Sequence, residues 1–271
     1  MKKQSFLFFI LSTSFLGALE ESPWLGDVYA FNLHANESYS RYRYIDNAVI
    51  QPHYAYNNYV NQISFSFTPA PSLGVEIECE MARTPHQLYG FRAMALGSRY
   101  RFFDDIAGDS FSLVLGGVLR SVGGRSVRDV SSPYASYMNY EVQCSLGKEF
   151  SKNANWTSRG YVMGSTGIAN HGSFWNRMSA FLEGRFFDSQ IFNVFTEGYF
   201  GYGSSNKVVI DDFRGWGYVR HSSLDIGASY KYAWLLWGEL GISYVYRILA
   251  KSYPQNVQTV EISYTLPFSL L

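Results

Sequence analysis

Apolar and polar residues alternate with a period of two along most of the chain. The clearest stretch is 73–81, where Leu73, Val75, Ile77, Cys79 and Met81 alternate with Gly74, Glu76, Glu78 and Glu80. Successive side chains of an extended strand point to opposite sides, so this pattern predicts a strand with one apolar and one charged face. The glutamates cannot line a dry core, because an unpaired buried carboxylate is costly. The charged face must meet water or cations.

The same alternation predicts about twelve strands joined by two kinds of connection. The predicted strands span residues 28–45, 60–68, 73–81, 91–103, 111–120, 135–149, 157–168, 174–187, 191–203, 217–232, 240–248 and 257–268. Compact turns follow the even-numbered strands, and mostly longer polar loops, such as 46–58, 123–133 and 204–215, follow the odd-numbered ones. In strand 28–45 the apolar parity reverses, so we expect a β-bulge at 36–38. The Gly-rich strand 157–168 gives no clear parity.

Charged residues gather on the polar faces of these strands. The residues that we expect there are Glu76, Glu78, Glu80, Arg99, Arg101, Arg120, Glu141, Arg177, Glu183, Arg185, Glu197, Asp225, Lys231, Glu239, Arg247 and Glu261. If strands 73–81 and 91–103 pair as a hairpin, Glu76 and Glu78 come near Arg101 and Arg99. The apolar faces carry almost no charge at their centres. Aromatic residues near strand ends would suit the two girdles of a membrane barrel: Tyr100, Tyr140, Trp175, Tyr202, Trp216, Tyr232 and Tyr246.

The first residues have the features of an export signal. Met1, Lys2 and Lys3 precede a short apolar run that ends at Leu16, and Gly17 and Ala18 follow. A positive start, an apolar core and a small residue predict a signal peptide over 1–18. Residues 19–27 then form a short periplasmic lead, and 28–271 form one domain. No apolar run after residue 19 reaches the roughly 20 residues that a membrane helix needs.

The last predicted strand carries the most specific signal. Val260, Ile262, Tyr264, Leu266 and Phe268 share one face, and Thr259, Glu261, Ser263 and Thr265 share the other. This aromatic-ended segment resembles the recognition signal of Gram-negative outer-membrane β-barrel proteins, whose final strand is read by the insertion machinery. Here it ends at Phe268, three residues before the chain does. A soluble sandwich would show the same period but would not keep its charges on the inward side of so many strands.

The resemblance covers the whole chain after the signal. It implies an all-β fold, a transmembrane antiparallel up-and-down β-barrel of about twelve strands with a charged lumen, in the cell outer membrane. The partners that it implies are outer-membrane lipid, lipopolysaccharide and the barrel-insertion machinery. Short periplasmic turns, long external loops and two periplasmic termini agree with an even number of strands.

Composition narrows the function classes. The chain has 22 basic and 22 acidic side chains, hence no net formal charge, and without Lys2 and Lys3 the charge is −2. A near-neutral protein is not a nucleic-acid binder by charge. The sequence shows no phosphate loop, redox pair, dinucleotide fingerprint or metal-ligand pattern, so we expect no cofactor and no metal.

Three functions fit a barrel of this size. About eight strands are just filled by side chains and about sixteen to eighteen leave an open pore, and twelve lies between them. The first function is a narrow porin-like channel for small hydrophilic solutes, lined by the charged faces. The second is a closed structural or surface-binding barrel, in which those charges pair across the lumen and the loops bind a partner. The third is a lipid hydrolase, because His221, Ser223 and Asp225 share one face and are similar to the His-x-Ser pattern of outer-membrane phospholipases and lipid A deacylases.

Overall fold

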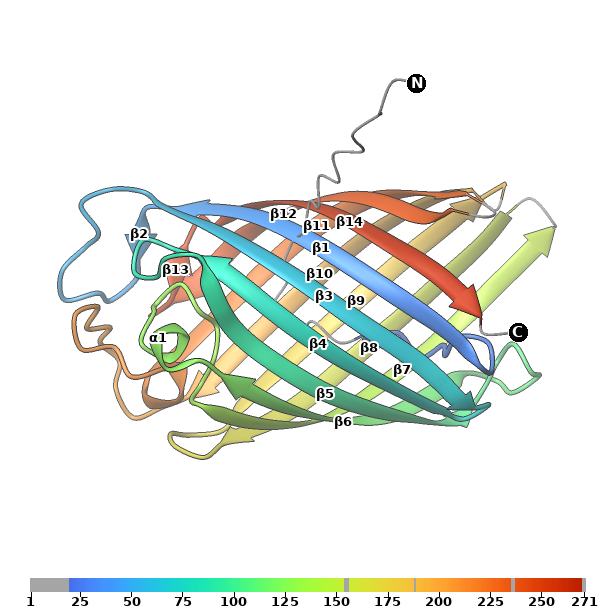
Figure 1. Cartoon of the computed structure of the whole chain (residues 1–271), viewed down its shortest axis with the longest axis horizontal. Helices are drawn as coiled ribbons and strands as arrows, with labels where there is room; N and C mark the ends of the chain where they lie inside the picture. The colour runs from blue at the N-terminus through green and yellow to red at the C-terminus, as the bar shows by residue number, and fades with distance from the viewer. Residues whose placement is uncertain (1–19, 154–155, 188, 235–236, 270–271) are drawn as a thin grey trace, which may run out of the picture.

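Twelve antiparallel strands close into one barrel in the part of the chain that the computed structural model describes, residues 20–153, 156–187, 189–234 and 237–269 (Figure 1). Each strand pairs with its neighbours in the chain, and β1 closes the barrel by pairing with both β3 and β14. The strands are β1 (Ala30–Tyr42), β3 (Tyr56–Ala70), β4 (Leu73–Arg83), β5 (Gly90–Phe103), β6 (Ser112–Val122), β7 (Met138–Asn153), β8 (Trp156–Ala169), β9 (Trp175–Phe186), β10 (Gln190–Tyr202), β11 (Arg220–Trp234), β12 (Gly238–Lys251) and β14 (Gln258–Ser269). The up-and-down barrel expected from the sequence is confirmed. Within the described ranges, no helix is long and apolar enough to cross a membrane.

The four short elements lie among the loops at one end of the barrel. They are β2 (Tyr44–Ile45), α1 (Gly124–Val127), η1 (Trp216–Tyr218) and β13 (Pro254–Gln255), and β2 pairs with β13. Figure 1 shows β2, β13 and α1 at the left end, and the C-terminus at the other end with the short turns. In barrels of this kind the short turns and termini face the periplasm, so the loop-rich end is the external one.

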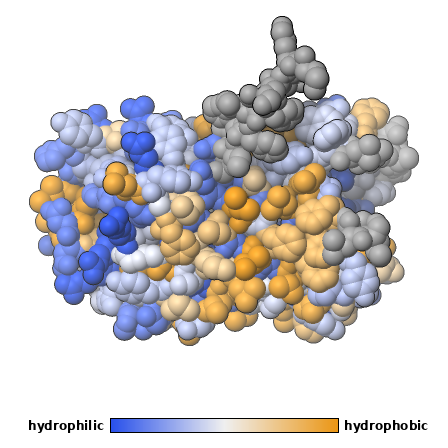
Figure 2. Space-filling model, viewed as in Figure 1, coloured by the Kyte–Doolittle hydropathy of each residue, from blue (hydrophilic) through white to orange (hydrophobic). Residues whose placement is uncertain are grey.

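The outer surface carries the apolar members of each alternating pair. Exposed side chains such as Leu96, Leu119 and Ile242 point away from the barrel, and Figure 2 shows an apolar belt over the middle of the barrel beside a hydrophilic loop end. Cys79 and Cys144 are free and exposed on this surface. An apolar outer face and a polar inner face are what a lipid environment requires of a membrane barrel.

The bulge expected at 36–38 is absent. β1 pairs residue by residue with β14 from Ala30 to Arg41 and with β3 from Phe31 to Tyr42, without a shift of register. Tyr42 therefore faces inward, where it is buried among the external loops, and Tyr44 belongs to β2. The aromatic side chain at this end of β1 points inward because it packs in a protein core there and not against lipid. The unbroken alternation also turns Glu37 outward, since it pairs with Ile262, which the sequence analysis did not expect.

The glycines of the inner face make room for large aromatic side chains. A Cβ on Gly167 would lie 2.2 Å from the Trp175 ring, and one on Gly227 would lie 2.3 Å from the Phe195 ring. The first approach accounts for Gly167 of β8, whereas a Cβ on Gly164 of the same strand would meet nothing within 4 Å. In the structure Met163 and Ser165 of β8 face inward and Val162 faces outward.

Candidate functional site in the lumen

All sixteen charged residues that we expected on the polar faces lie on the inner face of the barrel. Those buried almost completely are Glu76, Glu78, Glu80, Arg99, Arg120, Glu141, Asp225, Arg247 and Glu261, and those buried in part are Arg101, Arg177, Glu183, Arg185, Glu197, Lys231 and Glu239. The alternation of each strand alone decides this placement. Whether these residues line a conducting pore stays a prediction.

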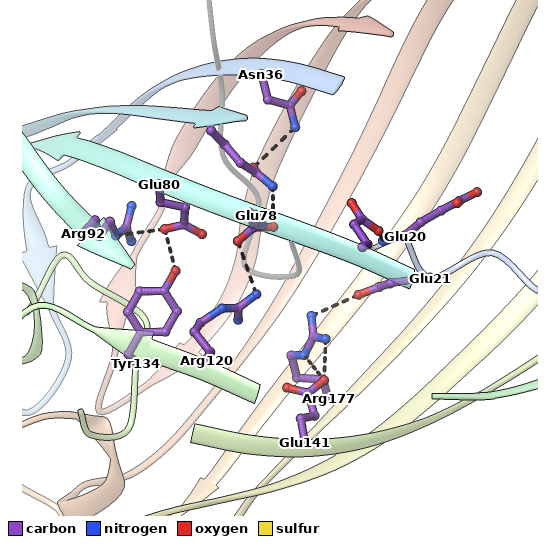
Figure 3. Close-up of polar contacts among 12 residues, drawn as sticks. Glu20, Glu21, Asn36, Glu78, Glu80, Arg92, Arg120, Tyr134, Glu141 and Arg177 are labelled. Atoms are coloured by element: carbon purple, nitrogen blue, oxygen red, sulfur yellow. Dashed lines mark hydrogen bonds and ion pairs between the residues drawn. The ribbon is translucent and has the colours of Figure 1, made fainter. Parts of the chain in front are cut away.

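The glutamates of β4 are held by neutral and cationic donors. Glu78 accepts a 2.8 Å hydrogen bond from Gln62 and lies 3.5 Å from the Arg120 guanidinium. Glu80 accepts a 2.5 Å hydrogen bond from the Tyr134 hydroxyl and lies 3.6 Å from Arg92 (Figure 3). Buried carboxylates persist when they are paired in this way.

The pairing expected between Glu76 or Glu78 and Arg101 or Arg99 was wrong. In the β4–β5 hairpin, Glu76 lies opposite Gly97 and Glu78 opposite Ala95. Arg101 instead binds Asp104 at 2.7 Å, near the periplasmic turn. The register of a hairpin is set by its turn and by packing over its length, so strand bounds alone did not place the partners.

Arg92 is a lumen residue that the sequence analysis missed. The β4–β5 ladder shifts between Glu80 and Met81, where Glu80 pairs with Ala93 and Met81 with Phe91. Arg92 is the extra residue of this β-bulge, and both Arg92 and Ala93 are buried on the inner side. By parity Arg92 would face lipid with Met94, and only the bulge turns it inward.

The ion pairs between wall residues stay close to the wall. Arg92–Glu80 and Arg247–Asp225 join adjacent strands, Arg120–Glu78 and Arg177–Glu141 join strands two places apart, and Arg185–Glu239 joins strands three places apart. Opposite walls of a twelve-strand barrel are six places apart. These pairs therefore brace the wall and do not span the lumen.

Loss of one partner of the Arg247–Asp225 pair should destabilise the barrel. Arg247 donates two hydrogen bonds of 2.7 Å to Asp225, and both side chains are nearly buried. Arg247→Met leaves a buried unpaired carboxylate, so we expect the free energy of unfolding to fall by about 3–5 kcal/mol. Urea unfolding in detergent measures it. Asp225→Asn added to Arg247→Met should recover part of the loss, whereas Arg214→Gln, which breaks an exposed pair with Asp212, should change little.

The described part of the lead, residues 20–27, enters the lumen, whereas we expected it in the periplasm; Gly26 and Asp27 at its end are exposed. Arg99 donates to the Glu20 carboxylate at 2.7 Å and to the Ser22 carbonyl at 2.7 Å. Arg177 and Ser179 donate to the Glu21 carboxylate at 3.0 and 2.9 Å, and Figure 3 shows the contact between Glu21 and Arg177. Glu20 thus contacts β5, and Glu21 contacts β9, four places further round the barrel. This segment bridges distant walls, and only its polar composition hinted at a lumen position.

Trp24 fixes the other end of this segment near the periplasmic turn between β5 and β6. Its indole donates a 3.0 Å hydrogen bond to Asp105, and its ring packs edge-on against Tyr161 of β8. Burial raises the pKa of the Asp105 carboxyl, but hydrogen bonds from the Glu149 amide, the Ser112 hydroxyl and Trp24 outweigh that effect and leave the pKa below its ordinary value. Asp105 is therefore a charged anchor for the segment at neutral pH.

The external loops close the other end of the lumen with an aromatic cluster. Trp216 is fully buried, its ring centroid lies 4.3 Å from that of Tyr253, and its indole donates to the Ser132 carbonyl at 2.7 Å. Three loops meet at this side chain. Trp216 and Trp175, which we expected in a membrane girdle, are thus part of an internal core, whereas Tyr100 and Tyr140 are exposed outside. An aromatic side chain suits both a membrane girdle and an internal core, so the residue type alone could not distinguish these two positions.

A chamber remains between this loop cluster and the strands. Its volume is about 90 Å³, and it is lined by Ser38, Asn58, Arg92, Tyr134, Arg247 and Tyr253 among others. A smaller cavity of about 20 Å³ lies beside Glu20 and Arg99. The lumen thus holds water-sized spaces, separated by the loops and by the N-terminal segment.

His221, Ser223 and Asp225 do not form a catalytic arrangement. His221 Nδ1 hydrogen-bonds the Val219 carbonyl, and its Nε2 has no partner among the described residues. The imidazole stacks on Tyr253, and Asp225 binds Arg247 instead of orienting the histidine. A serine nucleophile needs a base in hydrogen-bond reach and a group that orients this base. Within the described ranges, no group of three or more His, Cys, Asp or Glu could hold a metal ion.

The apolar face of β14 lies where the insertion signal requires it. Val260 and Phe268 are exposed on the outer surface, and Ile262, Tyr264 and Leu266 share their parity, while Glu261 is buried inside. The faces of this strand follow the alternation. Recognition by the insertion machinery stays a prediction, and the expected signal peptide lies outside the described residues.

Comparison with solved structures agrees with this architecture. An outer-membrane channel from Pseudomonas putida F1 superposes with a TM-score of 0.60 at 10% identity, covering 90% of this chain and 97% of that one. The NanC porin superposes with a TM-score of 0.55 at 9% identity, covering 88% of this chain and all of that one. No protein-family model and no curated protein matches the sequence. The closed strand order, apolar belt and charged interior define the chain as an outer-membrane β-barrel with the fold of porins and channels.

Proposed function

We propose that this barrel is an outer-membrane channel for small hydrophilic solutes, and not an enzyme. The observation that carries the proposal is the way the lumen is obstructed. The wall pairs lie along the wall, and the bodies that cross the lumen are the segment 20–27 and the external loops. A barrel closed for good by its own charges would need pairs between opposite strands. The solved structures similar in fold, an outer-membrane channel and a porin, support the proposal.

The lumen chemistry suits polar solutes. Carboxylates and guanidinia alternate along the inner face with serine, asparagine and glutamine side chains, and such groups can replace the hydration shell of a passing solute. Lipid and lipopolysaccharide would contact the outer belt, and the face of β14 that carries Val260 and Phe268 would be read by the insertion machinery.

Conductance of the refolded protein in planar bilayers tests the channel directly. We expect discrete open steps at neutral pH, and an ion selectivity that shifts toward anions at low pH as the glutamates Glu76, Glu78 and Glu80 become neutral. Folding is checked in the same sample by a shift of electrophoretic mobility on heating. A folded barrel that stays silent, even when residues 20–27 are displaced, would contradict the channel.

A further inference from the structure

We propose that Arg99 and Arg177 form a paired carboxylate site, which Glu20 and Glu21 of the chain occupy in this structure and which solutes with two carboxylates use in their place. The inference rests on the proposed channel function and specifies its solutes. Adjacent residues of an extended segment point to opposite sides, and Glu20 and Glu21 reach two distant walls in this way. A longer dicarboxylate such as sebacate presents the same two groups, because its carboxyl carbons are separated by as many bonds as those of two adjacent glutamates.

The site on the β5 wall is built to hold a carboxylate. Arg99 is buried to more than nine-tenths, and among the described residues Glu20 is the one carboxylate within ion-pair distance of it. Glu76 on the neighbouring strand accepts the amide of Glu20 at 3.0 Å and so aligns the segment beside this guanidinium. If Glu20 leaves, the Arg99 guanidinium remains in the lumen without an anionic partner, and it can take up the carboxylate of a solute.

The site on the β9 wall combines a guanidinium with a hydroxyl. Glu21 receives Arg177 on one carboxylate oxygen and the buried Ser179 hydroxyl on the other. Glu141 of β7 also binds Arg177, at 2.6 Å, so it fixes the guanidinium in place. Each oxygen of the bound carboxylate thus has its own donor, which is the arrangement that favours a planar carboxylate.

The experiment asks whether a free dicarboxylate binds where a mutation has removed the carboxylates of Glu20 and Glu21. In Glu20→Ala/Glu21→Ala the two carboxylates of the segment are gone, while Arg177 keeps Glu141 and Arg99 keeps the Ser22 carbonyl if the backbone stays seated. Sebacate binding to the purified barrel in detergent is measured by titration calorimetry and by the fluorescence of Trp24. We expect at least about tenfold tighter binding than to the wild-type protein, because a tethered competitor acts at a millimolar or higher effective concentration.

Two comparisons make the result specific. Arg99→Gln in the double-alanine background should lose at least about tenfold in sebacate affinity, whereas Arg214→Gln, which removes an arginine of an exposed external loop, should lose none. Acetate and monomethyl sebacate should bind at least about tenfold more weakly than sebacate. If the double-alanine protein does not fold, Glu21→Ala alone should bind acetate through Arg177 and Ser179.

The outcomes separate the site from the channel. Equal binding of sebacate and acetate, tighter binding of phosphate, or full binding after Arg99→Gln would overturn the carboxylate site. A barrel that conducts but shows no dicarboxylate preference would do the same and leave the channel standing. A barrel that binds sebacate but never conducts would support the site and refute the channel.

Discussion

The Glu20→Lys/Glu21→Lys protein should open far more often than the wild-type channel. The change places two ammonium groups against Arg99 and Arg177, where two carboxylates now bind. Breaking a buried pair costs about 3–5 kcal/mol, and the Glu20 pair adds little because that side chain is half exposed. Since 1.4 kcal/mol corresponds to tenfold, the ratio of displaced to seated segment should rise by a hundredfold or more.

Single-channel recording at fixed voltage measures this ratio as the fraction of time spent open. The matched control is Asp27→Lys, which makes the same change of charge as either one of the two substitutions, at an exposed residue of the same segment. It should leave the open fraction within about twofold of the wild-type value, as surface substitutions rarely exceed ±0.5 kcal/mol. An unchanged open fraction in the double-lysine protein would show that the barrier lies elsewhere, with the external loops as the next candidate.

The sequence predicted the faces of the strands well, because a strand's faces depend only on local alternation. Sixteen charged residues spread over nine strands lie on the inner side that their alternation predicted, and the longer loops and compact turns lie at opposite ends. Period two is a property of the extended backbone and needs no knowledge of the partner strand. Glu37, which was not among these residues, faces outward because the bulge expected at 36–38 does not exist.

The partners of the charged residues could not be predicted in the same way. Arg92 faces inward through a bulge in β5, and Glu80 is completed by Tyr134 from an external loop. Arg99 binds a residue 79 positions away along the chain. One extra residue in a strand exchanges its two faces, and contacts with loops depend on how the whole barrel closes. Neither effect leaves a periodic signal.

The plugging of the lumen from both ends was also beyond the sequence. The segment 20–27 is short and begins with polar residues, so it resembled an ordinary connecting segment. Trp216 resembled a girdle residue near the start of a strand. Both lie inside the barrel. Arg177 of the wall pairs with Glu21 of the segment, and buried aromatic side chains pack against Trp216. The interior of a twelve-strand barrel is wide enough to admit such segments.

Trp216→Ala should loosen the external loop cluster. Trp216 has no exposed surface and contacts Tyr253, Phe213 and His221 through its ring, so truncation leaves a large cavity and an unpaired Ser132 carbonyl. Replacing a buried tryptophan by alanine costs about 3–5 kcal/mol. Because the ring joins three loops and reaches the wall at His221, the second residue of β11, we expect the loops to open locally while the twelve-strand wall stays folded.

Limited trypsin digestion measures this opening. Lys207 and Arg214 lie in the loop that carries Trp216, and cleavage at either should become at least about a hundredfold faster if the cluster loses about 3 kcal/mol. Trp237→Ala, which truncates an exposed side chain at a periplasmic turn, should leave the cleavage rate unchanged. The mobility shift on heating should persist in both variants. Faster cleavage together with loss of that shift would mean that Trp216 supports the barrel itself, whereas an unchanged cleavage rate would mean that the loops are held by their backbone contacts alone.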